Sequence, residues 1–149
     1  MRHRNSGRRL GRKSPHRTAM YNNMVTSLLL HGRIETTEAK AKELRAYVDS
    51  TIQLSVDVVT LAAKGDKANP KERATLLHAR RQARLTVKTR EAMERLFNEV
   101  GPHFASTHSK GKGGYTRMLK TRNRKGDAAP MALVELVGLY QVEGATAEA

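Results

Sequence analysis

Residues 14–38, SPHRTAMYNNMVTSLLLHGRIETTE, predict a helix, a sharp stop and a short strand in immediate succession. Ser14 and Pro15 suit a helix start, because serine caps free N–H groups and proline has no N–H to satisfy. Large apolar residues then recur at helical spacing, and Gly32 supplies a left-handed stop. The alternation of residue types in 33–36 predicts a short strand.

Further helices are predicted downstream of this stretch. The longest covers about 38–64, with apolar stripes wide enough to need cover from several other elements. The next starts at Asn69 and Pro70, with Glu72 placed to complete a capping box. The last follows Thr89 as a cap and is expected to end at Gly101-Pro102.

The C-terminal third predicts a pair of strands. The segments 115–121 and 131–137 are expected to pair antiparallel across a turn at 124–127, after a loop rich in Gly, Ser and Lys at 103–114. The fold class is therefore α+β, with three to four helices packed on a small mixed or antiparallel sheet. We expect a basic extended arm at 1–13, a single α+β domain at 14–138 and an acidic mobile tail at 139–149.

Positive charge is concentrated in two segments that contain no Asp or Glu. Residues 1–34 carry a net charge of +8 and residues 101–126 carry +7, against +3 for 35–100 and −4 for 127–149. Such an excess favours a polyanionic partner, and nucleic acid is the natural one. A basic helix on a membrane surface fits poorly, because residues 1–13 contain only two large apolar side chains and several helix breakers.

Other functional classes lack their usual signals. The chain has no cysteine, hence no disulfide or thiol chemistry, and no apolar run long enough to span a membrane, so a protein of the cytoplasm is expected. The six histidines are irregularly spaced, which predicts no metal site. No nucleophile motif or paired acids suggest an enzyme, and no cofactor or small-molecule substrate is predicted.

Aromatic residues are scarce, with two Phe, four Tyr and no Trp. Phe97 and Phe104 are expected in the core, so recognition by base stacking on exposed rings is not expected. Six of the seven Lys and Arg residues in 1–17 are Arg, which binds phosphate in a bidentate manner. The sequence thus predicts recognition of phosphates and of RNA shape.

Three stretches resemble a known family. MRHRNSGRRLGRKSPHRTAMYNNMVTSLLLHGRIETTEAKAKELR at 1–45, LFNEVGPHFAS at 96–106 and GGYTRMLKTRNRKGDAAPMALVELV at 113–137 are similar to the bacterial large-subunit ribosomal protein seventeen family. The resemblance implies a structural constituent of the large subunit that binds 23S rRNA near the nascent-chain tunnel exit, with other ribosomal proteins as neighbours. The longer stretch at 105–112 and the tail depart from the family pattern.

The charge pattern and the resemblance together predict an RNA-binding set in two groups. The arm and the first helical turn contribute Arg2, His3, Arg4, Arg8, Arg9, Arg12, Lys13, His16 and Arg17. The loop and strand contribute Lys110, Lys112, Arg117, Lys120, Arg122, Arg124 and Lys125. Because Arg117 and Lys120 lie three apart on a strand, their side chains should leave opposite faces of the sheet.

Two other functions remain as alternatives. A DNA-compacting or regulatory protein would share the charge, but it usually needs a recognition helix or a β-ribbon, and neither stands out. An RNA-modifying enzyme ranks third, because a catalytic constellation is missing.

Overall fold

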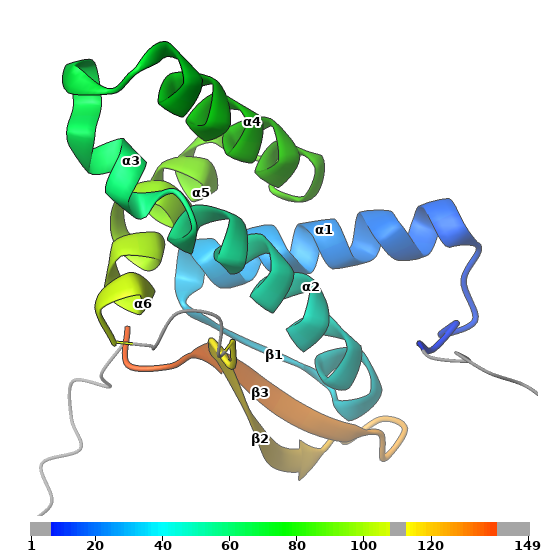
Figure 1. Cartoon of the computed structure of the whole chain (residues 1–149). Helices are drawn as coiled ribbons and strands as arrows, with labels where there is room; N and C mark the ends of the chain where they lie inside the picture. Colours follow the sequence, from blue (N-terminus) through cyan, green and yellow to red (C-terminus); the bar gives the residue numbers. More distant parts are fainter. Residues whose placement is uncertain (1–6, 108–112, 140–149) are drawn as a thin grey trace, which may run out of the picture.

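The computed structural model describes residues 7–107 and 113–139, which form helices packed on one face of a three-stranded sheet (Figure 1). The predicted α+β class is confirmed. The elements in chain order are α1 (Ser14–His31), β1 (Arg33–Thr37), α2 (Glu38–Val56), α3 (Val59–Lys64), a 3₁₀ turn η1 (Gly65–Lys67), α4 (Pro70–Thr86), α5 (Arg90–Arg95), a π-helical turn η2 (Leu96–Val100), α6 (Gly101–Thr107), β2 (Thr116–Asn123) and β3 (Pro130–Leu136).

The sheet is antiparallel throughout, with β3 between β1 and β2. The predicted pairing of the two C-terminal strands is confirmed, and β1 adds to the free edge of β3. Ala132, Val134 and Leu136 of β3 are buried beneath the helices. The residues between them, including Glu135, lie on the opposite face, because side chains alternate along a strand.

Helix α1 ends as predicted but starts differently. Lys13 is the N-cap residue and no side chain caps the first turn, so the predicted capping by Ser14 is wrong; Pro15 does lie in the first turn. At the other end Gly32 has φ +73°, and its N–H donates to the carbonyl oxygen of Leu28 at 2.8 Å. This left-handed residue reverses the chain so that β1 follows at once.

The predicted helix at 38–64 is interrupted at Asp57 and Val58. Val58 has φ −111° and ψ 4°, outside helical geometry, and its side chain is buried. The β-branched residues around it are weak helix formers, so a break here costs little helix stability while the core takes up Val58. α3 then continues to Lys64.

The predicted stop at Gly101-Pro102 is wrong, because the helix continues to Thr107. Gly101 is in helical geometry, with φ −59°, and its N–H donates to the carbonyl oxygen of Leu96 in the π turn. This wider turn shifts the hydrogen-bond register before Pro102, which has no N–H to donate. Gly101 is instead a point of close approach, since a Cβ there would lie 2.8 Å from Ser55 Oγ.

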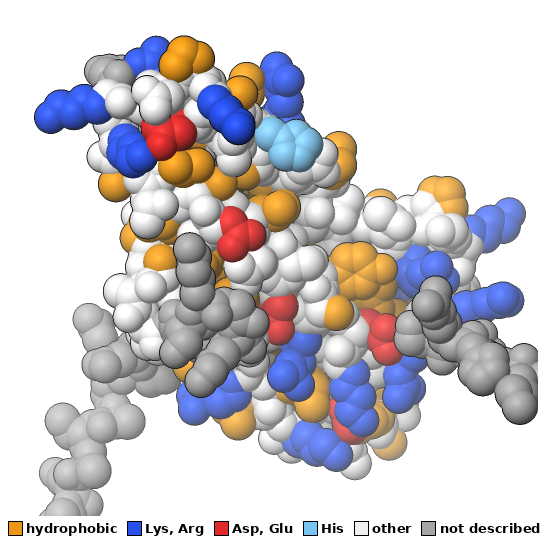
Figure 2. Space-filling model, in the orientation of Figure 1, with side chains coloured by type: hydrophobic (Ala, Val, Ile, Leu, Met, Phe, Trp, Pro, Cys, Tyr) orange, Lys and Arg blue, Asp and Glu red, His pale blue; other side chains and the backbone are white. Residues whose placement is uncertain are grey.

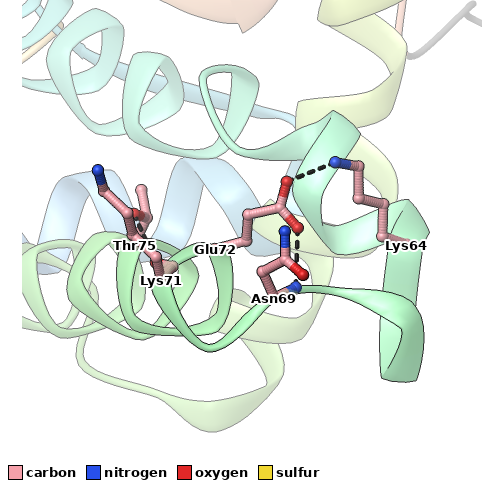
Figure 3. Close-up of polar contacts among 5 residues, drawn as sticks. All are labelled: Lys64, Asn69, Lys71, Glu72 and Thr75. Atoms are coloured by element: carbon pink, nitrogen blue, oxygen red, sulfur yellow. Dashed lines mark hydrogen bonds and ion pairs between the residues drawn. The ribbon is translucent and has the colours of Figure 1, made fainter.

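Local caps hold the outer helices in place. The N–H of Asn69 donates to Glu72 Oε2 at 2.9 Å in the predicted capping box, and Glu72 also contacts Lys64 Nζ of α3 at 2.5 Å (Figure 3). Thr89 caps α5 by accepting from the N–H of Ala92.

α1 and α2 cover the sheet, while α4 and α5 pack on the side of these helices that faces away from it (Figure 1). Phe97 and Phe104 are buried, as predicted.

Replacing Gly32 with alanine is expected to lower the free energy of unfolding by about 1–2 kcal/mol, because a side chain is strained in the left-handed region. The measurement is urea denaturation of the two proteins. Gly126→Ala is the matched control: an added Cβ there meets no atom within 4 Å, and the change should stay within about 0.5 kcal/mol. Equal losses for both variants would contradict this role of Gly32.

Candidate nucleic-acid interface

The described part of the arm, residues 7–13, makes a turn next to the start of α1. The N–H of Arg12 donates to the carbonyl oxygen of Arg9 at 3.1 Å, and Leu10 and Gly11 both have positive φ. Leu10 is half-buried against the hydrophobic core. The arm therefore packs on the domain through one apolar side chain, while Arg8, Arg9 and Lys13 stay exposed.

Strand β2 and the turn after it hold the second basic group, and acids from β1, from β3 and from the same turn pair with it. Arg117 Nε donates to Glu135 Oε1 at 2.6 Å across the sheet, and Arg122 Nε lies 3.5 Å from Glu35 Oε1. Arg124 donates two hydrogen bonds to Asp127, at 2.8 and 2.5 Å. A segment without acids in the sequence is thus partly neutralised in the fold.

The two faces of the sheet divide this basic group, as predicted. Lys120 lies opposite Ala132 on the helix-covered face, and its Nζ is 3.2 Å from Glu38 Oε1 at the start of α2. Arg117 lies opposite Glu135 on the other face. Their side chains are 71% and 61% exposed, so both cations remain accessible.

The first turns of α2 connect the two basic groups. Glu38 contacts Lys120 of β2, and five positions later Glu43 Oε1 lies 3.8 Å from Arg8 Nε of the arm. Five residues rise about 7.5 Å along the helix axis and turn about 140° around it, so the arm and β2 lie at the same level of α2 but on different sides of it. Figure 2 shows Lys and Arg gathered beside the start of α1 and along the sheet, with Asp and Glu among them.

Two of the acids in these ion pairs have lowered pKa values. Hydrogen bonds from Lys42 and then Lys120 hold the pKa of Glu38 below its ordinary value. The Arg124 guanidinium lowers the pKa of Asp127 to about 2. The acids are therefore charged at neutral pH, but exposed pairs of this kind contribute only about 0–1 kcal/mol each. A phosphate group that competes for the same cation meets little resistance.

The predicted site residues divide into described and undescribed positions. Arg2, His3, Arg4, Lys110 and Lys112 lie outside the described residues. The others occupy the arm and the start of α1, or β2 and its turn, where His16 and Lys125 are exposed and Arg17 is half-buried. Within 7–107 and 113–139, no cluster of three or more His, Asp and Glu side chains is arranged to hold a metal ion. No helix in these ranges has the length and apolar character needed to cross a membrane.

Three features of this surface were not predicted. Arg33 of β1 lies opposite Glu135, which places an Arg, a Glu and an Arg in one row across the open face of the sheet. Helix α4 exposes the basic residues Arg80, Arg81 and Arg84. Two tyrosines, Tyr21 and Tyr47, stack beside the arm. Only the α4 charge had a sequence signal, in the run HARRQAR.

Comparison with known proteins gives a consistent match. The family described as ribosomal protein L17 matches residues 20–137. The large ribosomal subunit protein bL17 of Desulfotalea psychrophila is 47% identical over 150 residues, covering 100% of both chains. That of Desulfosudis oleivorans is 48% identical over 141 residues, 95% of this chain and 58% of that protein. That of Desulforapulum autotrophicum is 48% identical over 137 residues, 92% of this chain and 97% of that protein.

The resemblance expected from residues 1–45, 96–106 and 113–137 is thereby confirmed over most of its length. β2 and the turn after it, which carry the second basic group, fall inside the matched range, whereas the first group at 2–17 precedes it. The chain belongs to the ribosomal protein L17 family.

Proposed function

We propose that this protein is a structural constituent of the large ribosomal subunit and binds 23S rRNA through the phosphates and shape of the RNA. It has no catalytic role in this proposal, and its place is near the nascent-chain tunnel exit, beside other ribosomal proteins in the cytoplasm. Family membership supports the ribosomal assignment. The net charge of +14 supports a polyanionic partner.

One observation carries the RNA-binding part of the proposal. The two acid-free segments, far apart in the sequence, lie on either side of the first turns of α2, where Glu43 contacts Arg8 and Glu38 contacts Lys120. A surface of this kind offers many cations to one folded RNA rather than a few to separate ligands. In this proposal the domain at 14–138 presents the basic RNA-binding surface, and the arm at 1–13 adds further cations to it.

The carboxylates of this surface act as partners that phosphate replaces. Glu135 holds the Arg117 guanidinium over the sheet, and Asp127 holds that of Arg124. Each pair orients a planar donor group that would otherwise move freely, and a phosphate accepts the same fork of N–H groups.

The alternative of a DNA-compacting protein receives no support from the three relatives compared above, which are all named as large-subunit proteins. The RNA-modifying alternative has no support either, since every carboxylate with a lowered pKa in the part of the chain that the structure describes pairs with a Lys or Arg on the surface.

The proposal predicts a steep salt dependence of binding to 23S rRNA. If about six to eight phosphates are neutralised, log K should fall with log salt with a slope of about −5 to −7. Deleting residues 1–13 should flatten the slope by several units, because the deletion removes six positive charges. Filter binding at several salt concentrations measures the slope for both proteins.

Deleting residues 139–149 serves as the control for this experiment. The tail contains two Glu and no Lys or Arg, so its removal should leave affinity unchanged or slightly higher. A slope that survives deletion of the arm would mean that the arm is only solvated charge.

A pair of substitutions tests Arg117. Arg117→Gln should weaken rRNA binding by about 1 kcal/mol, the contribution of one charge-assisted hydrogen bond, with little effect on stability. Glu135→Gln should instead strengthen binding, because it removes a competing charge and frees Arg117. Competition binding and thermal denaturation measure both effects. If Arg117→Gln lowers the melting temperature and spares binding, Arg117 is a packing residue.

A further inference from the structure

A cavity of about 540 Å³ lies between the arm and the first two helices. Residues 7–9 of the arm form one wall, Arg17 and Tyr21 of α1 form the second, and Glu43 and Tyr47 of α2 form the third. Gly7 has φ +88°, which lets the arm turn along the cavity. The volume is within the range of about 300–1,000 Å³ that small-molecule sites occupy.

The tyrosines give this cavity an aromatic surface. The rings of Tyr21 and Tyr47 stack with centroids 4.5 Å apart and planes 13° from parallel. Tyr21 is only 1% exposed and supports the second ring from the core, whereas Tyr47 is 38% exposed and lines the cavity. A rigid ring with an accessible surface is the platform on which nucleic-acid bases stack.

The Tyr21 hydroxyl is the second independent feature. It is buried and has no hydrogen-bond partner among the described residues, which is unfavourable for a polar group. Burial, followed by the charge of Glu43, raises the pKa of this hydroxyl, so it remains a protonated donor at neutral pH. Its ring lines the cavity, and because the hydroxyl itself is closed off from solvent, a ligand oxygen or nitrogen reaches it after a small displacement of the residues around it.

The charge in the cavity suits a phosphate. Three guanidinium groups, of Arg8, Arg9 and Arg17, line it together with one carboxylate, that of Glu43. Glu43 Oε1 lies 3.8 Å from Arg8 Nε, which leaves two net positive charges. A carboxylate repels phosphate but accepts from a ribose hydroxyl or an exocyclic amine, so all four groups have a counterpart on a nucleotide.

We propose that this cavity holds one unpaired nucleotide of the bound RNA, with its base on Tyr47, its phosphate against the arginines and a polar atom on the Tyr21 hydroxyl. The proposal rests on the RNA binding proposed above and deepens it. A paired base inside an RNA helix is stacked on both sides, so it has no free face to offer Tyr47. The protein thus recognises a bulged or looped nucleotide, in contrast to the phosphate-only recognition expected from its few aromatic residues.

The test uses the full-length protein and three probes: labelled pentaadenylate, a blunt RNA duplex and inorganic phosphate. Fluorescence anisotropy should show that pentaadenylate binds and that phosphate displaces it only at much higher concentration. Tyr47→Leu, which keeps apolar bulk but removes the ring, should weaken pentaadenylate binding roughly tenfold and leave duplex binding unchanged.

A pair of matched hydroxyl deletions separates binding from folding. Tyr21→Phe should weaken pentaadenylate binding roughly three- to tenfold, while the melting temperature stays the same or rises, because an unsatisfied buried group is removed. Tyr115→Phe is the control, because the Tyr115 hydroxyl donates to Gln53 Oε1 at 2.5 Å outside the cavity. It should lower the melting temperature and leave pentaadenylate binding unchanged.

The outcomes distinguish this inference from the proposed function. If Tyr21→Phe and Tyr47→Leu leave pentaadenylate binding intact, or if phosphate displaces pentaadenylate at an equal concentration, the nucleotide site is wrong. Steep, salt-dependent binding of 23S rRNA would then still support the proposed function. If the unmodified protein does not bind 23S rRNA at all, both the nucleotide site and the proposed function are wrong.

Discussion

The buried face of α2 is the constraint on which the rest of the structure depends. Ala41, Leu44, Val48 and Ile52 of this face are fully buried, and the sheet, α1, α4 and α6 all pack against the helix. Close approach at Ser55 also requires glycine at position 101. Burying a large aliphatic side chain contributes about 1.5–3 kcal/mol, so this one stripe outweighs any of the surface ion pairs.

The exposed side of the same helix organises the charged surface. Glu38 and Glu43 project from its first turns toward β2 and the arm, and Tyr47 follows one turn later beside Tyr21. Packing of the apolar stripe therefore sets where these acids and the aromatic ring lie. The basic residues gain defined positions because the helix that carries their partners is itself rigidly packed.

Much of the fold was predictable because its signals are local. Gly32 stops α1, Asn69 and Glu72 form a capping box, and Thr89 caps α5, each within a few residues of its partner. The two failures in helix length have a non-local cause. Gly101-Pro102 has the composition of a helix stop, but packing against Ser55 and a π turn carry the helix through it. The break at Val58 arises because the core takes up its side chain.

The sequence by itself determined the helix and strand types, the excess of positive charge in two segments and membership of the family. These properties depend on composition and on residues close together along the chain. Only the tertiary structure decided the strand order, the acids that pair with Arg8, Arg117 and Lys120, and the stacking of Tyr21 on Tyr47. Each of these requires groups from separate elements to meet, and their distance is set by core packing and sheet register rather than by local propensity.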